Sequence, residues 1–100
     1  MHDADKLHDK LNRETGKVSW GELEKAFAQG RVLFVGEVLD LVSVAVSVSE
    51  DDVQAVREWM NTGQLRQVAS SEAEVWSASN QVFWAVVVAP WVLIQVAKPQ

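Results

Sequence analysis

Apolar residues recur three and four positions apart in three stretches of the chain, which is the spacing that gives a helix one buried face. The helices predicted on this basis cover about 3–14, 19–30 and 52–62, and a further short helix over about 70–80 is predicted from its capping serines and its apolar anchors Val75 and Trp76. Their ends carry the expected signals. Ser19 and Glu22 have the spacing of a capping box, Ser70 or Ser71 is placed to cap the last helix, and Gly30 and Gly63 stand where a glycine commonly ends a helix.

Two other stretches are continuous apolar runs, which are typical of buried strands. One is Val32–Val35; the other is Val82–Ile94, after which the extended pattern continues to Val96. Pro90 interrupts this run, and since it has no N–H to donate to a ladder it indicates an edge or a bulge. Leu65 to Val68 is a shorter candidate strand. The pattern therefore predicts a single α+β domain over 1–100, with a small three- to four-stranded sheet and four or five helices packed on it. The sheet is expected to use about 31–36, 64–69 and 82–96.

The stretch 40–49 fits two kinds of structure. Its valines alternate with serines and alanine, and this period of two favours a strand. Asp40, however, is a good helix N-cap, and apolar residues behind it also fall on one helical face. That face would consist of Leu41, Val44, Ala45 and Val48. Periodicity alone leaves both structures open.

Composition narrows the class of protein. Hydrophobic residues make up 48% of the chain and charged residues 23%, which is ordinary for a folded domain. The net charge of -5 disfavours nucleic acids and anionic membranes as partners, and the absence of cysteine excludes disulfides and thiol nucleophiles. The polar start of the chain lacks the apolar core of a secretory signal, and the run from Val82 to Ile94 is too short to span a membrane. We therefore expect a cytoplasmic protein with mobile tails at 1–6 and 98–100.

Acidic residues are concentrated between Val32 and Val56, where there is no base, and the densest group is Glu50, Asp51 and Asp52. Carboxylate oxygens are the ligands that Mg²⁺ and Ca²⁺ prefer, so this group is a candidate metal site. The ordinary alternative is that Asp51 or Asp52 caps the following helix and that the acids complement its dipole. Adjacent residues at a helix start point in different directions, and no calcium-loop spacing follows, so capping is the favoured interpretation.

Other chemistry is sparse. A surface metal site could be formed by His2 and His8 together with Asp5 and Asp9. No metal-ligand motif accompanies these residues, so a helix face exposed to water is the favoured interpretation. No serine lies in a Gly-x-Ser-x-Gly elbow, and no glycine-rich loop is suited to phosphate. The sequence thus indicates no catalytic constellation and no cofactor.

The five tryptophans divide into two groups. Trp20, Trp59 and Trp76 lie on different predicted helices and are expected to be core anchors. Trp84 and Trp91 flank Pro90 within an uncharged stretch; their odd separation predicts opposite faces of the sheet unless a bulge changes the register. An outward tryptophan beside a proline edge would suit a binding surface, so Trp84, Pro90 and Trp91 are the predicted binding residues. The alternative is that helices cover both faces.

The run Phe83 to Gln95 resembles one particular bacterial family, as do the earlier segments Glu14-Thr15, Trp20-Gly21-Glu22-Leu23, Asp40-Leu41-Val42 and Glu50-Asp51-Asp52 with Trp59. The family is known as domain of unknown function 2288, and the resemblance covers about residues 7 to 95. It implies a bacterial, stand-alone, soluble protein. It supplies no activity and no catalytic residues. Members of the family look alanine-rich around 45–49, which favours the helix for 40–49.

Two hypotheses of function follow. The first is a non-enzymatic protein-interaction module that binds a protein partner, possibly a second copy of itself through 82–96. The second is a small-molecule or divalent-metal-dependent enzyme in which Asp40 and Glu50–Asp52 face a tryptophan-lined pocket. Nucleic-acid binding through an exposed tryptophan lacks the positive groove that such proteins use.

Overall fold

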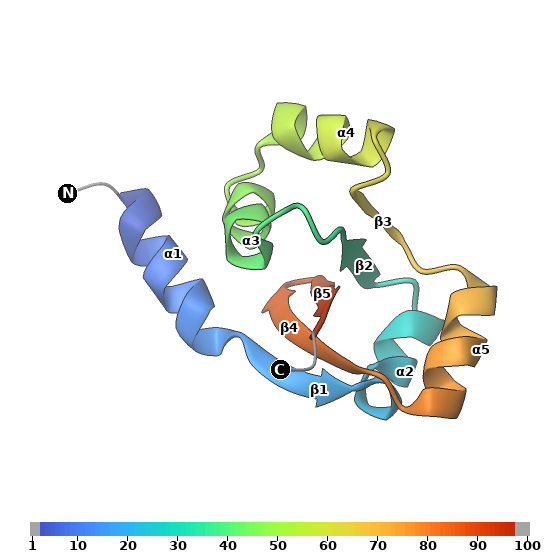
Figure 1. The fold of residues 1–100 in the computed structure, drawn as a ribbon. Helices are drawn as coiled ribbons and strands as arrows, with labels where there is room; N and C mark the ends of the chain where they lie inside the picture. Colours follow the sequence, from blue (N-terminus) through green and yellow to red (C-terminus); the bar gives the residue numbers. More distant parts are fainter. Residues whose placement is uncertain (1–2, 98–100) are drawn as a thin grey trace.

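The computed structural model describes residues 3–97, with side chains from residue 6 onward, and contains five helices and five strands (Figure 1). The α+β fold predicted from the sequence is confirmed, but the sheet has one strand more than the expected three to four. The elements in chain order are α1 (Asp3–Glu14), β1 (Gly16–Ser19), α2 (Trp20–Ala28), β2 (Val32–Val35), α3 (Leu41–Ser49), α4 (Val53–Asn61), β3 (Leu65–Gln67), α5 (Ser70–Ser79), β4 (Val82–Val88) and β5 (Trp91–Val96).

The additional strand is β1, which follows α1 after a single residue and pairs antiparallel with β4. It has four residues, and Val18, opposite Phe83, is its one large apolar side chain. A segment this short cannot show a period of two. Its extended conformation depends on the ladder that β4 offers, which lies far away in the sequence.

The sheet has the order β1-β4-β5-β2-β3, with β2 and β5 parallel and every other pair antiparallel. Pro90 therefore does not mark an edge or a bulge. It stands with Ala89 in the two-residue turn that joins β4 to β5, outside the ladder. Both strands of this hairpin are interior, and the edges are β1 and β3. Interior strands have no free edge for charged residues to protect, so the lack of charge in 82–96 does not require an interface there.

Residues 41–49 form a helix, as the resemblance implied. The Asp40 carboxylate accepts hydrogen bonds from the backbone N–H of Ser43 at 3.0 Å and from its hydroxyl at 2.7 Å. Leu41, Val44 and Ala45 are buried. The valine–serine alternation was therefore misleading, because the N-cap and one buried helical face override a β-type pattern.

Local hydrogen bonds set where α2 and α5 begin, and the N-cap residue of α5 differs from the predicted one. The Glu22 carboxylate accepts from the Ser19 N–H at 2.8 Å, as a capping box requires. The N-cap of α5 is Ala69, not Ser70 or Ser71. Alanine has no acceptor in its side chain, and the Glu72 carboxylate instead accepts from the Ala69 N–H at 3.1 Å.

Helices cover both faces of the sheet (Figure 1). On one face α1, α3 and α4 enclose a core of aliphatic side chains that includes Leu11, Leu33, Val44, Val86 and Leu93. On the other face α2 and α5 enclose an aromatic core. Its members are Trp20, Phe27, Phe34, Trp76 and Phe83. Trp20 and Trp76 are anchors of this second core, as predicted.

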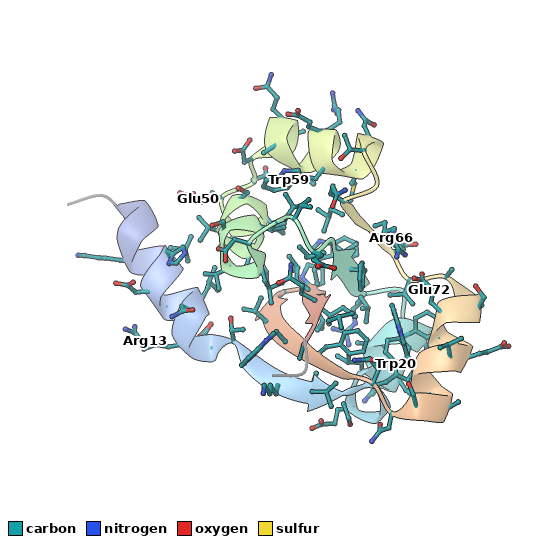
Figure 2. The ribbon with its side chains drawn as sticks, in the orientation of Figure 1. Arg13, Trp20, Glu50, Trp59, Arg66 and Glu72 are labelled. Atoms are coloured by element: carbon teal, nitrogen blue, oxygen red, sulfur yellow. The ribbon has the colours of Figure 1, made fainter. Side chains whose placement is uncertain are left out.

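An ion pair joins β3 to α5. The Arg66 guanidinium donates to both carboxylate oxygens of Glu72, at 2.6 and 2.8 Å, and lies 4.7 Å above the ring of Phe34. Figure 2 shows the two charged side chains facing each other across the surface. The hydrogen bonds from Arg66 lower the pKa of the Glu72 carboxyl below its ordinary value.

This shift gives the Glu72 contribution a defined pH dependence. A carboxyl whose pKa is lowered by folding stabilises the protein above its unfolded pKa, about 4.3, and loses that contribution as the pH falls through the folded value. At pH 7 we expect Glu72→Gln to lower the free energy of unfolding by up to about 1 kcal/mol, because the pair is partly exposed. Urea denaturation at pH 7 and pH 3 measures the difference, with Glu74→Gln in the same helix as control. A loss that is equal at both pH values would contradict the assignment.

Candidate functional site

A groove of about 740 Å³ lies between α1, α4, the end of α3 and the turn that joins β4 to β5. We call it the α1/α4 groove. Its apolar lining includes Leu7 and Leu11 of α1, Val53, Val56 and Met60 of α4, and Pro90 and Trp91 of the hairpin. The volume falls in the range of about 300 to 1,000 Å³ that is typical of ligand sites.

Helix α4 forms the more exposed wall. Val53, Val56 and Met60 follow the i, i+3, i+7 spacing of one helical stripe, and all three line the groove. Val56 packs partly against the aliphatic core, whereas Val53 is 53% exposed and Met60 is 48% exposed. No residue of α4 is fully buried. The sequence shows that this stripe is apolar, and the structure shows that its two ends, Val53 and Met60, are about half exposed to solvent.

Trp59 turns away from the groove. It was expected to be a core anchor, and it packs partly buried against the aliphatic core from beneath α4 (Figure 2). Helix α4 is therefore held to the body of the protein mainly by Trp59 and Val56. Val53 and Met60, at the two ends of the stripe, are left for the groove.

Helix α1 forms the opposite wall with few anchors. Among its described side chains, Leu11 is buried and Leu7 is half-buried. Lys10 and Glu14 lie on its groove side. Two apolar side chains one turn apart make a thin apolar stripe, which is typical of a helix that lies on the surface or packs on a partner.

The rim of the groove carries both signs of charge. Lys10 and Glu14 stand on the α1 wall; Arg57 stands on the α4 wall, and Asp51 and Asp52 stand where that wall begins. The rim is thus nearly balanced, although the whole chain has a net charge of -5. An electrostatic funnel for a strongly charged ligand would need one sign to dominate.

The structure brings together some of the predicted site residues and separates others. Pro90 and Trp91, from one predicted site, meet Asp51 and Asp52, from the other, in the α1/α4 groove. Glu50 is the C-cap residue of α3 (Figure 2). It lines neither this groove nor the hollow described next.

Trp84 and Asp40 lie elsewhere, in a hollow of about 260 Å³ that Thr15 and Gln95 also line. The ammonium nitrogen of Lys17 lies 5.0 Å from the centre of the Trp84 ring. Both Gln95 and Asp40 are engaged in structural hydrogen bonds: the Gln95 amide donates to the carbonyls of Gly36 and Leu39, and Asp40 caps α3. Gln95 and Asp40 in this hollow therefore serve to stabilise the fold.

The prediction that Trp84 and Trp91 lie on opposite faces of the sheet is wrong. Trp91 pairs across the hairpin with Val88, which lies four residues beyond Trp84 on β4. Residues four apart on a strand share a face, and so do directly paired residues on neighbouring strands. Both tryptophans therefore lie on the face that α1, α3 and α4 cover. The turn at Pro90 reverses the chain, so the two tryptophans lie on different strands. An odd sequence separation gives opposite faces only within one continuous strand, so that rule does not apply here.

The acid cluster has structural roles. Asp51 has a φ of +58° directly after the C-cap of α3, where glycine is the usual residue. The Asp52 carboxylate caps α4 by accepting from the Ala55 N–H at 3.2 Å. Within the described part of the chain, no group of three or more histidine or acidic side chains is arranged to hold a metal ion. The candidate site around His2 and Asp5 lies outside the described side chains.

These roles predict opposite effects for two adjacent residues. Asp52→Ala is expected to lower the free energy of unfolding by about 1 kcal/mol through loss of the cap. Asp51→Gly is expected to be neutral or to raise it by up to about 1 kcal/mol, because glycine adopts positive φ without strain. Thermal denaturation with and without Mg²⁺ or Ca²⁺ measures both effects. A cation-induced rise in Tm that both substitutions abolish would instead support a metal site.

The sequence model of the family described as "Protein of unknown function (DUF2288)" matches residues 6–96. The chain belongs to the DUF2288 family. The resemblance found in the sequence, over about residues 7 to 95, is thereby confirmed. The match indicates no function.

A solved structure agrees with this assignment. The chain is similar to the NMR solution structure of PA1075 from Pseudomonas aeruginosa, with 39% sequence identity and a TM-score of 0.81. The similarity covers 99% of this chain and 92% of that one. The comparison with curated proteins gives no match. Over the described residues, no helix has the length and apolar character needed to cross a membrane.

Proposed function

We propose that this DUF2288 protein is a non-enzymatic protein-interaction module whose α1/α4 groove binds the apolar face of a helix from a protein partner. The observation that carries the proposal is the stripe of α4, whose Val53 and Met60 are about half exposed within the groove. Grooves that bind amphipathic helices offer such apolar walls and take anchors spaced at i, i+3 and i+7.

Two features support a protein segment over other occupants. The balanced rim suits a segment of mixed charge and offers nothing to a polyanion such as a nucleic acid. The enzyme hypothesis gains no support, because the carboxylates of Asp40 and Asp52 already serve as helix caps. The hairpin at 82–96, the first candidate for an interface, contributes to the groove through its turn and the adjoining strand ends, from Val87 to Trp91.

Met60 gives a direct test. As a probe we choose a synthetic helical peptide of leucine, lysine and glutamate with leucines at i, i+3 and i+7. Wild-type protein should bind it saturably, with amide NMR shifts confined to α1, α4 and the β4–β5 turn. Met60→Glu should raise the Kd at least about tenfold, because it removes apolar contact and places a charge against the leucines.

The matched control is Val75→Glu on α5, since Val75 is 64% exposed and lies outside the groove. It should leave the affinity unchanged. Equal weakening by both substitutions, or shifts centred on α2 and α5, would contradict the proposed groove. Saturable binding of a small apolar dye at the groove, with no binding of the peptide, would favour a small-molecule ligand instead.

A further inference from the structure

Arg57 stands beside the apolar stripe of α4 that the proposed partner helix would cover. It lies four residues after Val53 and three before Met60, and residues at these spacings are neighbours on the surface of a helix. All three side chains line the α1/α4 groove. A helix that covers both half-exposed ends of the stripe therefore also passes over the guanidinium of Arg57.

The guanidinium of Arg57 has no counterion in the protein. Among the side chains that the structure describes, it takes part in no ion pair, and its residue is exposed to water. An acid on the same helix could reach it from the positions three or four residues away. Those positions hold Val53, Gln54, Met60 and Asn61.

The acids at the rim of the groove are placed for other roles. Asp51 and Asp52 precede α4, and the Asp52 carboxylate is engaged in capping that helix. Glu14 stands on α1 four residues after Lys10, which is the spacing of a charge pair along one helix. Of the two bases among the described residues that line the groove, Arg57 is thus the one without an acid at this spacing on its own helix.

The cost of covering Arg57 defines the chemistry of the partner. Removing a charged group from water is expensive unless an opposite charge replaces the water. Resting on the function proposed above, we infer that the partner helix carries an aspartate or glutamate among its apolar anchors and that Arg57 binds this carboxylate. A guanidinium suits the task, because it can donate two parallel hydrogen bonds to one carboxylate.

The spacing of the anchors gives the carboxylate its position. In a helix with anchors at i, i+3 and i+7, position i+4 lies between the first and third anchors, as Arg57 lies between Val53 and Met60. A side chain at i+4 stands on one side of the anchor row. Its pairing with Arg57 therefore selects one of the two directions in which a helix can lie in the groove, so the charge pair contributes specificity as well as affinity.

Four forms of the leucine peptide test the inference on the intact protein at pH 7. Three of them carry glutamate, glutamine or lysine at position i+4. Wild-type protein should bind the glutamate peptide about tenfold more tightly than the glutamine peptide, because a charge-assisted hydrogen bond replaces a neutral one, and should bind the lysine peptide most weakly. In the fourth peptide the glutamate is exchanged with the residue at i+5, which points away from the anchors, and the gain should be lost. Titration calorimetry measures each Kd.

Substitutions of Arg57 identify the group that reads the carboxylate. Arg57→Glu should reverse the order of affinities, so that the lysine peptide binds most tightly. Arg57→Lys should keep the order with a smaller difference, because an ammonium group cannot form the bidentate pair. The matched control is Arg13→Glu, which makes the same change of charge at an exposed position of α1 that does not line the groove. It should leave the order as in wild-type protein, and all three variants should keep their far-UV circular dichroism.

The outcomes separate this inference from the proposed function. Equal affinities for the peptides, with binding that still depends on Met60, would overturn the role of Arg57 and leave the interaction module intact. A reversal by Lys10→Glu and not by Arg57→Glu would place the carboxylate at the α1 wall and would also overturn the assignment. If wild-type protein bound none of the peptides, the proposed function and this inference would fail together.

Discussion

Replacing Trp20 with alanine is expected to lower the free energy of unfolding by about 3–5 kcal/mol. The side chain is 1% exposed and fills the space between α2, α5 and the sheet (Figure 2). Its ring centre lies 5.4 Å from those of Phe27 and Trp76 and 6.1 Å from that of Phe83. Alanine would leave a cavity among three aromatic rings that cannot collapse without moving both helices.

Urea denaturation and differential scanning calorimetry measure this effect. A domain of this length loses about 4–8 °C of Tm per kcal/mol, so Trp20→Ala should lower Tm by at least about 12 °C. Two controls define the cause. Trp20→Phe should recover part of the loss by refilling the cavity, and Trp84→Ala should cost much less because Trp84 is 40% exposed. Equal losses for Trp20→Ala and Trp84→Ala would contradict the prediction that burial in the aromatic core sets the size of the loss.

Replacing Leu11 with aspartate is expected to detach α1 from the rest of the protein. Leu11 is 4% exposed and is the buried anchor among the described side chains of this helix. An unpaired carboxylate in its place costs several kcal/mol, more than a helix with so few anchors gains by docking. The groove would lose one wall, so peptide binding should fail.

Hydrogen exchange followed by mass spectrometry separates detachment from general unfolding. Amides of α1 should lose protection in Leu11→Asp, whereas those of β4 and β5 should keep most of theirs. Asn12→Asp introduces the same residue at the next, exposed position and should leave α1 protected. If the strands lost protection together with α1, the helix would not be a separate cooperative unit.

The parts of the fold that the sequence predicted depend on local chemistry. Glu22 starts α2 by bonding to Ser19, and Asp40 starts α3 by bonding to Ser43. Gly30 and Gly63 follow helix ends with φ of +71° and +79°, as expected of glycines at those positions. Each of these signals acts over three or four residues, so the residues alone can indicate it.

The parts that were missed depend on contacts between distant segments. Strand β1 exists because β4 lies beside it, and the hairpin lies inside the sheet because β1 and β2 flank it. The shared face of Trp84 and Trp91 follows from the register across that hairpin. The groove, too, depends on contacts between distant segments. The stripe of α4 is visible in the sequence, but its exposure depends on where α1 and the β4–β5 turn come to lie.

The sheet order has a consequence for the time course of folding. Gly16 pairs with Ala85, and Leu33 pairs with Leu93, so β1 and β2 reach the sheet only through β4 and β5. On a ribosome, neither core can close before residues 82–96 have been made, although the helices that cover them are synthesised earlier. Pairing over such separations makes folding slower than that of a helical bundle of the same length. The nascent chain therefore carries uncovered apolar helix faces through most of its synthesis, and its dependence on chaperones should peak just before the hairpin emerges.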